Sequence, residues 1–372
     1  MMNNLDRRQW LKAMGLTSAF IAFNGVEKLA ASAHTRVLPA DGQPLRLNAN
    51  ENPFGPSKKV REAITKSFDE GCRYPFRVLN TLVEAIAEKE GVPTDHVVVT
   101  GGSTEGLHAT GLVYGKDGGE VIAADPTFQA LMRYAENFGA HIHRVPLDDQ
   151  LTHDLNAMAK RVTSKTRLIF ICNPNNPTGT LLPSAALEDF IKSMDNKAVI
   201  FSDEAYYDFI TEPDYPSMVK LVKQGRNVIV SKTFSKIYGL AGLRIGYLIA
   251  RPDIADRLKK AVMANTNMYA IEAAKAALAD DEFYKFSVSK NMEAKNYLYS
   301  LFDDLNLNYI KSHTNFVFFK TGRHINGLID DMKNENVLIG RPFPPMYDWA
   351  RISTGTIEEG KLFGNALRKV MA

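Results

Sequence analysis

The sequence is poor in cysteine, and this scarcity excludes one whole way of stabilising a fold. Only Cys72 and Cys172 occur in 372 residues. A protein of this size is not held together by one possible bridge, so a disulfide framework is excluded. We expect two free thiols, one of them buried in a strand.

Concentrated charge and repetition are absent as well. The formal net charge is +3, from 45 basic and 42 acidic residues, and no Lys/Arg run is dense enough to follow a phosphate backbone. We therefore expect no nucleic-acid partner. With 45% hydrophobic residues the chain can bury a large core, and its length favours two domains. Because no long linker or fixed-period repeat divides it, these domains should be interleaved.

Residues 1–33 differ from the rest of the chain. Arg7 and Arg8 precede a weakly apolar run over 13–23, which is too short to span a bilayer, and small side chains follow at Ala31 and Ala33. This layout predicts a signal peptide cleaved after Ala33, with no membrane anchor afterwards. The string RRQWLK resembles the twin-arginine export signal, which implies export of a folded protein to the periplasm. The alternative is an amphipathic helix that caps the domain of a cytoplasmic protein.

Residues 65–263 alternate short β-branched or apolar runs with helix-length segments. The expected strands are Val97–Thr100, Val121–Ala124, His141–Val145, Leu168–Cys172, Val199–Ser202 and Val228–Ser231. This alternation predicts an α/β domain built around a mainly parallel sheet.

The pattern changes in residues 264–372, where a long helical region precedes a strand at Asn315–Phe319. We expect a smaller α+β domain there, joined by the N-terminal segment 34–64. Thr356 and Glu359 form a capping box that begins the last helix. The helix should bury its apolar positions, which are Leu362, Phe363, Ala366, Leu367 and Val370.

Polar residues follow several of the predicted strands, where an open α/β sheet binds its ligands. A glycine turn, Gly101-Gly102, leads into Ser103 and Thr104 at a helix start, whose free amides and hydroxyls suit a phosphate. Such a turn is also common in proteins that bind no phosphate. Phe128 would stand at the mouth of the same cleft, unless it is simply part of the core.

Three further strand ends carry polar or charged side chains. Asn176 lies in NPNNPTG, whose prolines fix the backbone and aim the amide at one place. Asp203 and Tyr206 follow the next strand, although Asp203 would equally serve as a helix cap.

The last strand runs into a glycine-rich segment with Lys236 and Arg244. A partly desolvated lysine there becomes a nucleophile toward an aldehyde, which is Schiff-base chemistry.

Together these segments resemble the aspartate-aminotransferase superfamily of pyridoxal-phosphate (PLP) enzymes. Its signatures occur in the family order, as GGSTE, NPNNPTG, DEAY and SKTFSKIYGLAGLRIGY, with WARIS near the end. The resemblance implies fold type I, a mainly parallel seven-stranded sheet plus a smaller α+β domain, and ping-pong amino transfer to a 2-oxo acid. PLP is the implied cofactor, and we expect no metal.

The resemblance also implies a role for each matching residue. Lys236 looks like the lysine that carries PLP and moves the substrate proton, and Asp203 like the partner of the pyridine nitrogen. Tyr206 and Asn176 resemble the pair that binds the ring hydroxyl, and Phe128 the ring that stacks on the pyridine. The implied phosphate cup consists of Gly102, Ser103, Thr104, Thr233 and Arg244.

Within the superfamily the sequence is most similar to the histidinol-phosphate aminotransferase group. The matching segments are LNANENPFG, which contains Asn52, and GRPF, which contains Arg341. By this resemblance Arg351 binds the substrate carboxylate, and Arg341 and Asn52 also contact substrate. Tyr74 would reach the neighbouring site of a homodimer. Phe76 departs from the acid usual in the family, so Arg341 is equally compatible with a carboxylate or an uncharged side chain.

Two other functions are compatible with the same motifs. A fold type I lyase would release pyruvate and ammonia by β-elimination without forming a new amino acid. A non-catalytic PLP-binding protein would bind the cofactor without turnover. Incubation with amino acids and 2-oxoglutarate separates all three.

Overall fold

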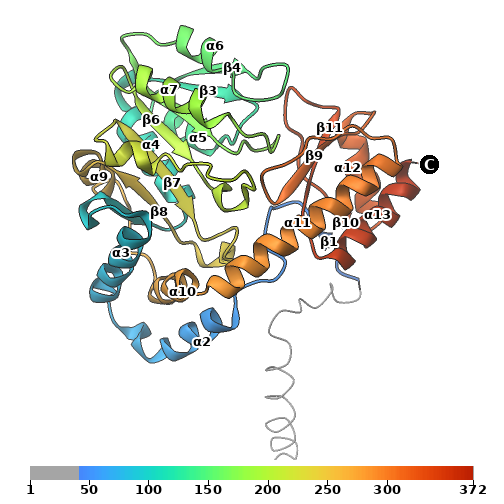
Figure 1. Ribbon diagram of the computed structural model, residues 1–372, viewed down its shortest axis with the longest axis horizontal. Coiled ribbons are helices and arrows are strands. Elements are labelled where there is room, and N and C mark those ends of the chain that lie inside the picture. The colour runs from blue at the N-terminus through green and yellow to red at the C-terminus, as the bar shows by residue number, and fades with distance from the viewer. Residues whose placement is uncertain (1–41, 372) are drawn as a thin grey trace, which may run out of the picture. The chain divides into compact units, whose positions relative to one another are not determined.

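The computed structural model describes residues 42–371 (Figure 1). The predicted signal peptide, residues 1–33, and the beginning of the 34–64 segment lie outside the described residues. Within the described part of the chain, no helix is long and apolar enough to cross a membrane.

A seven-stranded sheet with the order β2-β8-β7-β6-β5-β3-β4 forms the centre of the larger part. Its strands are β2 (Val97–Thr100), β3 (Glu120–Asp125), β4 (His141–Pro146), β5 (Thr166–Cys172), β6 (Val199–Asp203), β7 (Val228–Thr233) and β8 (Gly246–Ala250). Strand β8 runs opposite to the other six strands of the sheet, since it pairs antiparallel with both β2 and β7. The carboxyl ends of the other strands therefore meet at one edge, where the predicted site residues follow them.

Helices cover both faces of this sheet, so its strands are buried on both sides. On β5, Leu168 and Phe170 belong to one core cluster, whereas Ile169 and Ile171 belong to the other. This alternation explains the continuous apolar runs of the sequence. The helices of the larger part are α2 (Lys58–Lys66), α3 (Phe76–Glu90), α4 (Ser103–Gly115), α5 (Ala130–Asn137), α6 (Leu155–Lys160), α7 (Ser184–Met194), α8 (Val219–Lys223), α9 (Pro252–Lys259) and α10 (Met268–Leu278).

A third core cluster lies among the C-terminal elements and the first strand. Strands β9 (Phe316–Lys320) and β11 (Trp349–Ser353) pair antiparallel, and β1 (Leu45–Arg46) pairs parallel with β10 (Val337–Leu338). The N-terminal segment thus contributes to this small α+β layer. Its helices are α11 (Asp281–Asp304), α12 (Ile325–Asn334) and α13 (Ile357–Met371).

The sequence predictions fail at a few points for identifiable reasons. Strand β8 was not predicted, because a glycine-rich segment precedes it and no helix-length run separates it from β7. The capping box of α13 is confirmed, since Thr356 N donates to Glu359 Oε2 (2.9 Å) and Glu359 N to Thr356 Oγ1 (3.1 Å). Leu362 was wrongly expected on the buried face: it is 46% exposed. Cys172 is a buried free thiol in β5, as expected, and Cys72 is an exposed one.

Candidate active site

A cavity of about 330 Å³ lies at the carboxyl edge of the sheet. Eleven of the fourteen predicted site residues line it, namely Ser103, Thr104, Phe128, Asn176, Asp203, Tyr206, Thr233, Lys236, Arg244, Arg341 and Arg351. Gly102, Asn52 and Tyr74 do not. These side chains come from segments more than 200 residues apart. Most of them lie at or just beyond the carboxyl ends of the parallel strands, which brings them together, whereas Arg341 and Arg351 come from the small α+β layer.

Lys236 lies three residues beyond β7 and points into this cavity. Its Nζ donates a hydrogen bond to the carbonyl of Asn50 (2.9 Å) and lies 5.6 Å from the centre of the Tyr206 ring. Burial, together with the positive charge of Arg351, lowers the pKa of Lys236 to about 8. A larger fraction of this amine than of an ordinary lysine is therefore uncharged near neutral pH, which favours its action as a nucleophile.

Asp203 is the last residue of β6 and is buried. It accepts a hydrogen bond from the backbone N–H of Ala205 (3.1 Å), and within residues 42–371 it has no ion-pair partner. Burial raises the pKa of Asp203 to about 7. The side chain is thus a buried acid that would be held in its charged form by a cationic ligand group.

Tyr206 is held by two asparagines. Its hydroxyl accepts from Asn50 Nδ2 (2.9 Å) and more weakly from Asn176 Nδ2 (3.5 Å). Asn50 is in turn fixed by Ser353, whose Oγ donates to Asn50 Oδ1 (2.9 Å). Asn50 lines the cavity but was not predicted, although its position inside LNANENPFG was a usable signal. It has φ 54°, a left-handed conformation that asparagine tolerates better than most residues.

The predicted phosphate cup is assembled around Arg244. This residue has φ 56°, and its guanidinium donates to the carbonyl of Ala241 (2.8 Å) and to Thr104 Oγ1 (3.3 Å). Gly102 has φ 81°, and a Cβ there would lie 2.4 Å from Arg244 Nη2. Glycine is therefore required for the guanidinium to approach the start of α4. The free amides of that helix and the arginine together suit an anion.

Arg351 and Arg341 approach the cavity from the small α+β layer. Arg351 Nη1 donates to Asn176 Oδ1 (2.8 Å) and Nη2 to the Asn48 carbonyl (2.9 Å), while its buried Nε has no partner. Burial lowers the pKa of Arg351 to about 10. The ring of Phe343 lies 4.4 Å from the Arg341 guanidinium and 5.0 Å from that of Arg351. Two cations thus share one wall, a suitable surface for an anionic substrate.

Besides Gly102, two predicted site residues do not line the cavity. Asn52 Nδ2 donates to the Ile237 carbonyl (2.8 Å) and to Ser287 Oγ (3.1 Å), so it supports the segment that carries Lys236. Tyr74 is 81% exposed and stacks on Phe76, with ring centres 5.7 Å apart. The structure therefore does not bring Tyr74 to the cavity of its own chain.

The residues present fit PLP, a pyridine aldehyde that carries a phosphate. Asp203 is a buried acid without a cation at ion-pair distance in the described chain, which suits a pyridine nitrogen. Lys236 is an amine of lowered pKa, which suits an aldehyde. The glycine at position 102 leaves Arg244 free to approach the start of α4, which suits a phosphate.

Known proteins similar to this chain share its length and arrangement. The family model for aminotransferase class I and II matches residues 43–363. The histidinol-phosphate aminotransferase of Moorella thermoacetica is 38% identical over 331 residues, covering 88% of this chain and 86% of that protein.

Two solved structures extend the similarity to three dimensions. A protein of Erwinia carotovora atroseptica SCRI1043, named as a candidate histidinol-phosphate aminotransferase, has a TM-score of 0.86 and 30% identity, covering 90% of this chain and 98% of its own. The histidinol-phosphate aminotransferase of Sinorhizobium meliloti, solved with pyridoxal-5'-phosphate, has a TM-score of 0.82 and 26% identity, covering 88% and 91%.

Proposed function

The chain belongs to the class I and II aminotransferase family, and from this premise we propose that the cavity around Lys236 is its active site. The protein is a PLP-dependent aminotransferase similar to histidinol-phosphate aminotransferases. The observation that carries the assignment of the site is the presence of two groups with shifted pKa values in one cavity. A lysine whose pKa is lowered and an acid whose pKa is raised line one cavity. Titratable groups shifted in this way are typical of catalytic sites.

Bound at this site, PLP would supply an electron-withdrawing ring that stabilises the negative charge left when a C–H proton departs. The Lys236 amine would take that proton from the substrate α-carbon and return it to the carbon of the cofactor's aldehyde group. Asp203 would keep the ring nitrogen protonated, and Tyr206 with Asn176 would hold the ring hydroxyl. Arg351 would bind the substrate carboxylate and so fix the α-carbon near Lys236.

The donor and acceptor use the same cavity in turn. An amino acid binds first and leaves as a 2-oxo acid, and a second 2-oxo acid then binds and leaves as an amino acid. Both have a carboxylate beside the reacting carbon, so one arginine serves both. This ping-pong order explains why one cavity suffices for two substrates.

We propose that the substrate carries an anionic group that Arg341 binds, either the phosphate of an amino-alcohol phosphate such as histidinol phosphate or a second, side-chain carboxylate of an amino acid. Arg341 to glutamine should lower kcat/KM for such a donor by about 10-fold to 100-fold, mainly through KM, since a charged hydrogen bond is lost. A screen of histidinol phosphate, acidic, aromatic and neutral amino acids against 2-oxoglutarate measures this. Arg368 to glutamine, which removes an exposed partner of Asp304, is the matched control. Activity confined to uncharged donors, or unchanged in the Arg341 variant, would contradict the proposal.

We propose that the protein is a homodimer in which Tyr74 reaches the neighbouring active site. Large apolar side chains are exposed at Phe68, Tyr74, Phe76 and Met263, by 58%, 81%, 60% and 79%. Exposed apolar surface of this kind favours a protein contact.

Mixed dimers test the role of Tyr74. Chains with Lys236 to alanine and chains with Tyr74 to alanine should each be nearly inactive. After mixing and reassociation, one site of each hybrid is complete, so about a quarter of the wild-type activity should return. Mixing Lys236 to alanine with the double variant gives no complete site and is the control. No recovery in hybrids that are shown to form would overturn the proposal.

We also propose export to the periplasm through the twin-arginine signal at Arg7 and Arg8, with cleavage after Ala33. That route carries folded proteins, so PLP would be loaded before export. Changing both arginines to lysine should leave the full-length protein in the cytoplasm, which cell fractionation and immunoblotting would show. Periplasmic protein at wild-type amounts in this variant would exclude the twin-arginine route.

A further inference from the structure

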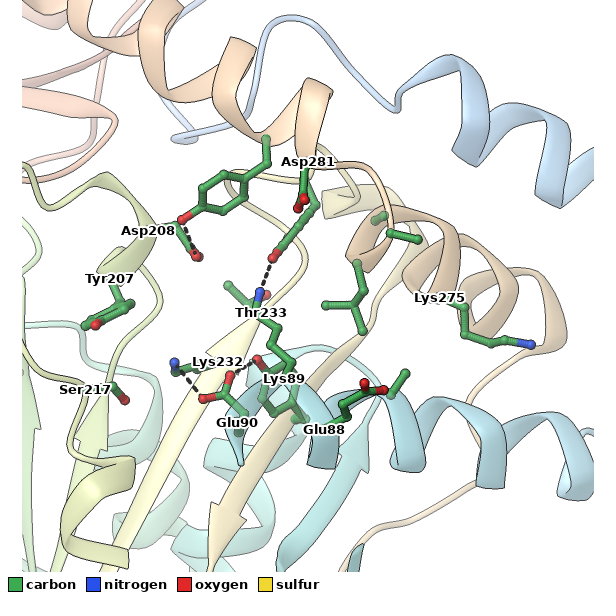
Figure 2. Close-up of a pocket in the computed structure, with 17 residues that line it drawn as sticks. Glu88, Lys89, Glu90, Tyr207, Asp208, Ser217, Lys232, Thr233, Lys275 and Asp281 are labelled. Atoms are coloured by element: carbon green, nitrogen blue, oxygen red, sulfur yellow. Dashed lines mark hydrogen bonds and ion pairs between the residues drawn. The ribbon is translucent and has the colours of Figure 1, made fainter. Parts of the chain in front are cut away.

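A second and larger cavity, of about 720 Å³, lies apart from the active site (Figure 2). Its walls are the end of α3, the end of β7, the segment around Tyr207, and the turn between α10 and α11. Only Thr233 lines both cavities. An occupant would therefore contact the strand that leads to Lys236, without entering the active site.

The inner wall of this cavity is a closed polar network. Lys232 Nζ lies 3.1 Å from Glu90 Oε2 and 3.6 Å from Glu204 Oε2, and 4.6 Å from the centre of the Tyr207 ring. Tyr247 donates to the other oxygen of Glu90 (2.7 Å). The attraction of these carboxylates outweighs burial and raises the pKa of Lys232. The charges of this network are already paired with one another. We therefore expect it to form a wall of the cavity, and a ligand to bind to other groups.

Four charged side chains on the remaining walls have no salt-bridge partner among residues 42–371, namely Glu88, Lys89, Asp208 and Asp281. Lys89 is the one cation among these four, and Asp208 is the carboxylate bonded to the same tyrosine that lies near Lys89. The Lys89 ammonium donates only to the hydroxyl of Tyr238. The Asp208 carboxylate accepts only from the hydroxyl of Tyr284 (3.0 Å). The ring of Tyr284 also lies 5.9 Å from Lys89 Nζ, so one tyrosine stands between the two charges. In Figure 2 both Lys89 and Asp208 point into the opening.

We propose that this cavity binds a small zwitterion, a free amino acid or a dipeptide, with its carboxylate on Lys89 and its ammonium on Asp208. A simple anion would leave Asp208 unpaired, and a simple cation would leave Lys89 unpaired. A molecule with both charges satisfies both, since charge-assisted hydrogen bonds are the strong ones. The aromatic rings of Tyr238 and Tyr284 provide an apolar wall for its side chain. The site is independent of which amino acid reacts at Lys236.

Equilibrium dialysis of the PLP-loaded protein tests this proposal after aminooxyacetate, a carbonyl reagent, has blocked the active site. Radiolabelled L-phenylalanine, L-glutamate and glycylglycine are the probes, used in separate runs. At least one should bind at about one molecule per chain. Lys89 to methionine and Asp208 to asparagine should each weaken that binding by about 10-fold to 100-fold.

Lys275 to methionine is the matched control, because its ammonium pairs with Glu272 (3.2 Å) and points away from the opening in Figure 2. It should bind the probe like the wild type. Phenethylamine and 3-phenylpropionate, each with one charge, should compete poorly. The proposal is overturned if no probe binds at millimolar concentration, if binding survives both substitutions, or if a singly charged competitor displaces the probe equally well. Since the active site is blocked, these outcomes do not depend on amino transfer.

Discussion

Replacing Lys236 with alanine is expected to abolish the visible absorbance that bound PLP gives in the wild type. The same change should lower amino-transfer activity on the order of 10⁴-fold. The reason is that one amine would perform two tasks, holding the cofactor aldehyde and moving the substrate proton. In the structure Lys236 is the only lysine among the residues described as lining the cavity. Absorbance spectra and single-turnover rates with a saturating donor measure both losses.

Lys236 to arginine is the matched control for this experiment. It keeps a positive charge and a long side chain, but a guanidinium stays protonated and is a poor nucleophile toward an aldehyde. It should therefore be as inactive as the alanine variant, while thermal unfolding shows that both variants remain folded. A yellow alanine variant with wild-type turnover would require another amine to carry the cofactor.

The sequence predicted the sheet edge well because the relevant signals are local. Strands β5, β6 and β7 each contain a continuous apolar run, 168–172, 199–201 and 228–230, and a chemically distinct residue lies at or just beyond the end of each strand. Parallel pairing then brings Asn176, Asp203 and Lys236 together. Most of this site could therefore be predicted from strand ends and family motifs.

Features that depend on distant contacts could not be predicted in this way. Asn50 is held by Ser353, 303 residues away, and no local pattern marks that pair. The second cavity is missed for the same reason. Lys89 lies in the last turn of α3 and Asp208 in a short 3-10 helix, and each is an ordinary surface charge by sequence. Only the folded chain shows that both face one opening.

The Asp203 to asparagine variant should lose amino-transfer activity on the order of 10³-fold, the scale of a lost electrostatic contact to the reacting group. Asparagine has nearly the same shape but no negative charge, so it would not keep the ring nitrogen protonated. Lys236 would remain in place, and the protein should still bind PLP. Measured kcat/KM and the visible spectrum separate this loss of chemistry from a loss of cofactor.

The same substitution should stabilise the cofactor-free protein above pH 7. The pKa of Asp203 is raised from 3.8 to about 7 by burial, so the folded state holds a proton that the unfolded state releases. Stability therefore falls as pH rises from about 4 to about 7 and stays lower above that range. Asparagine removes this cost, so Tm should be higher than in the wild type at pH 8 and nearly equal at pH 4.

Asp203 to glutamate keeps the charge and should recover part of the activity. An asparagine variant that is fully active, or less stable at pH 8 without PLP, would contradict this role for the buried carboxylate.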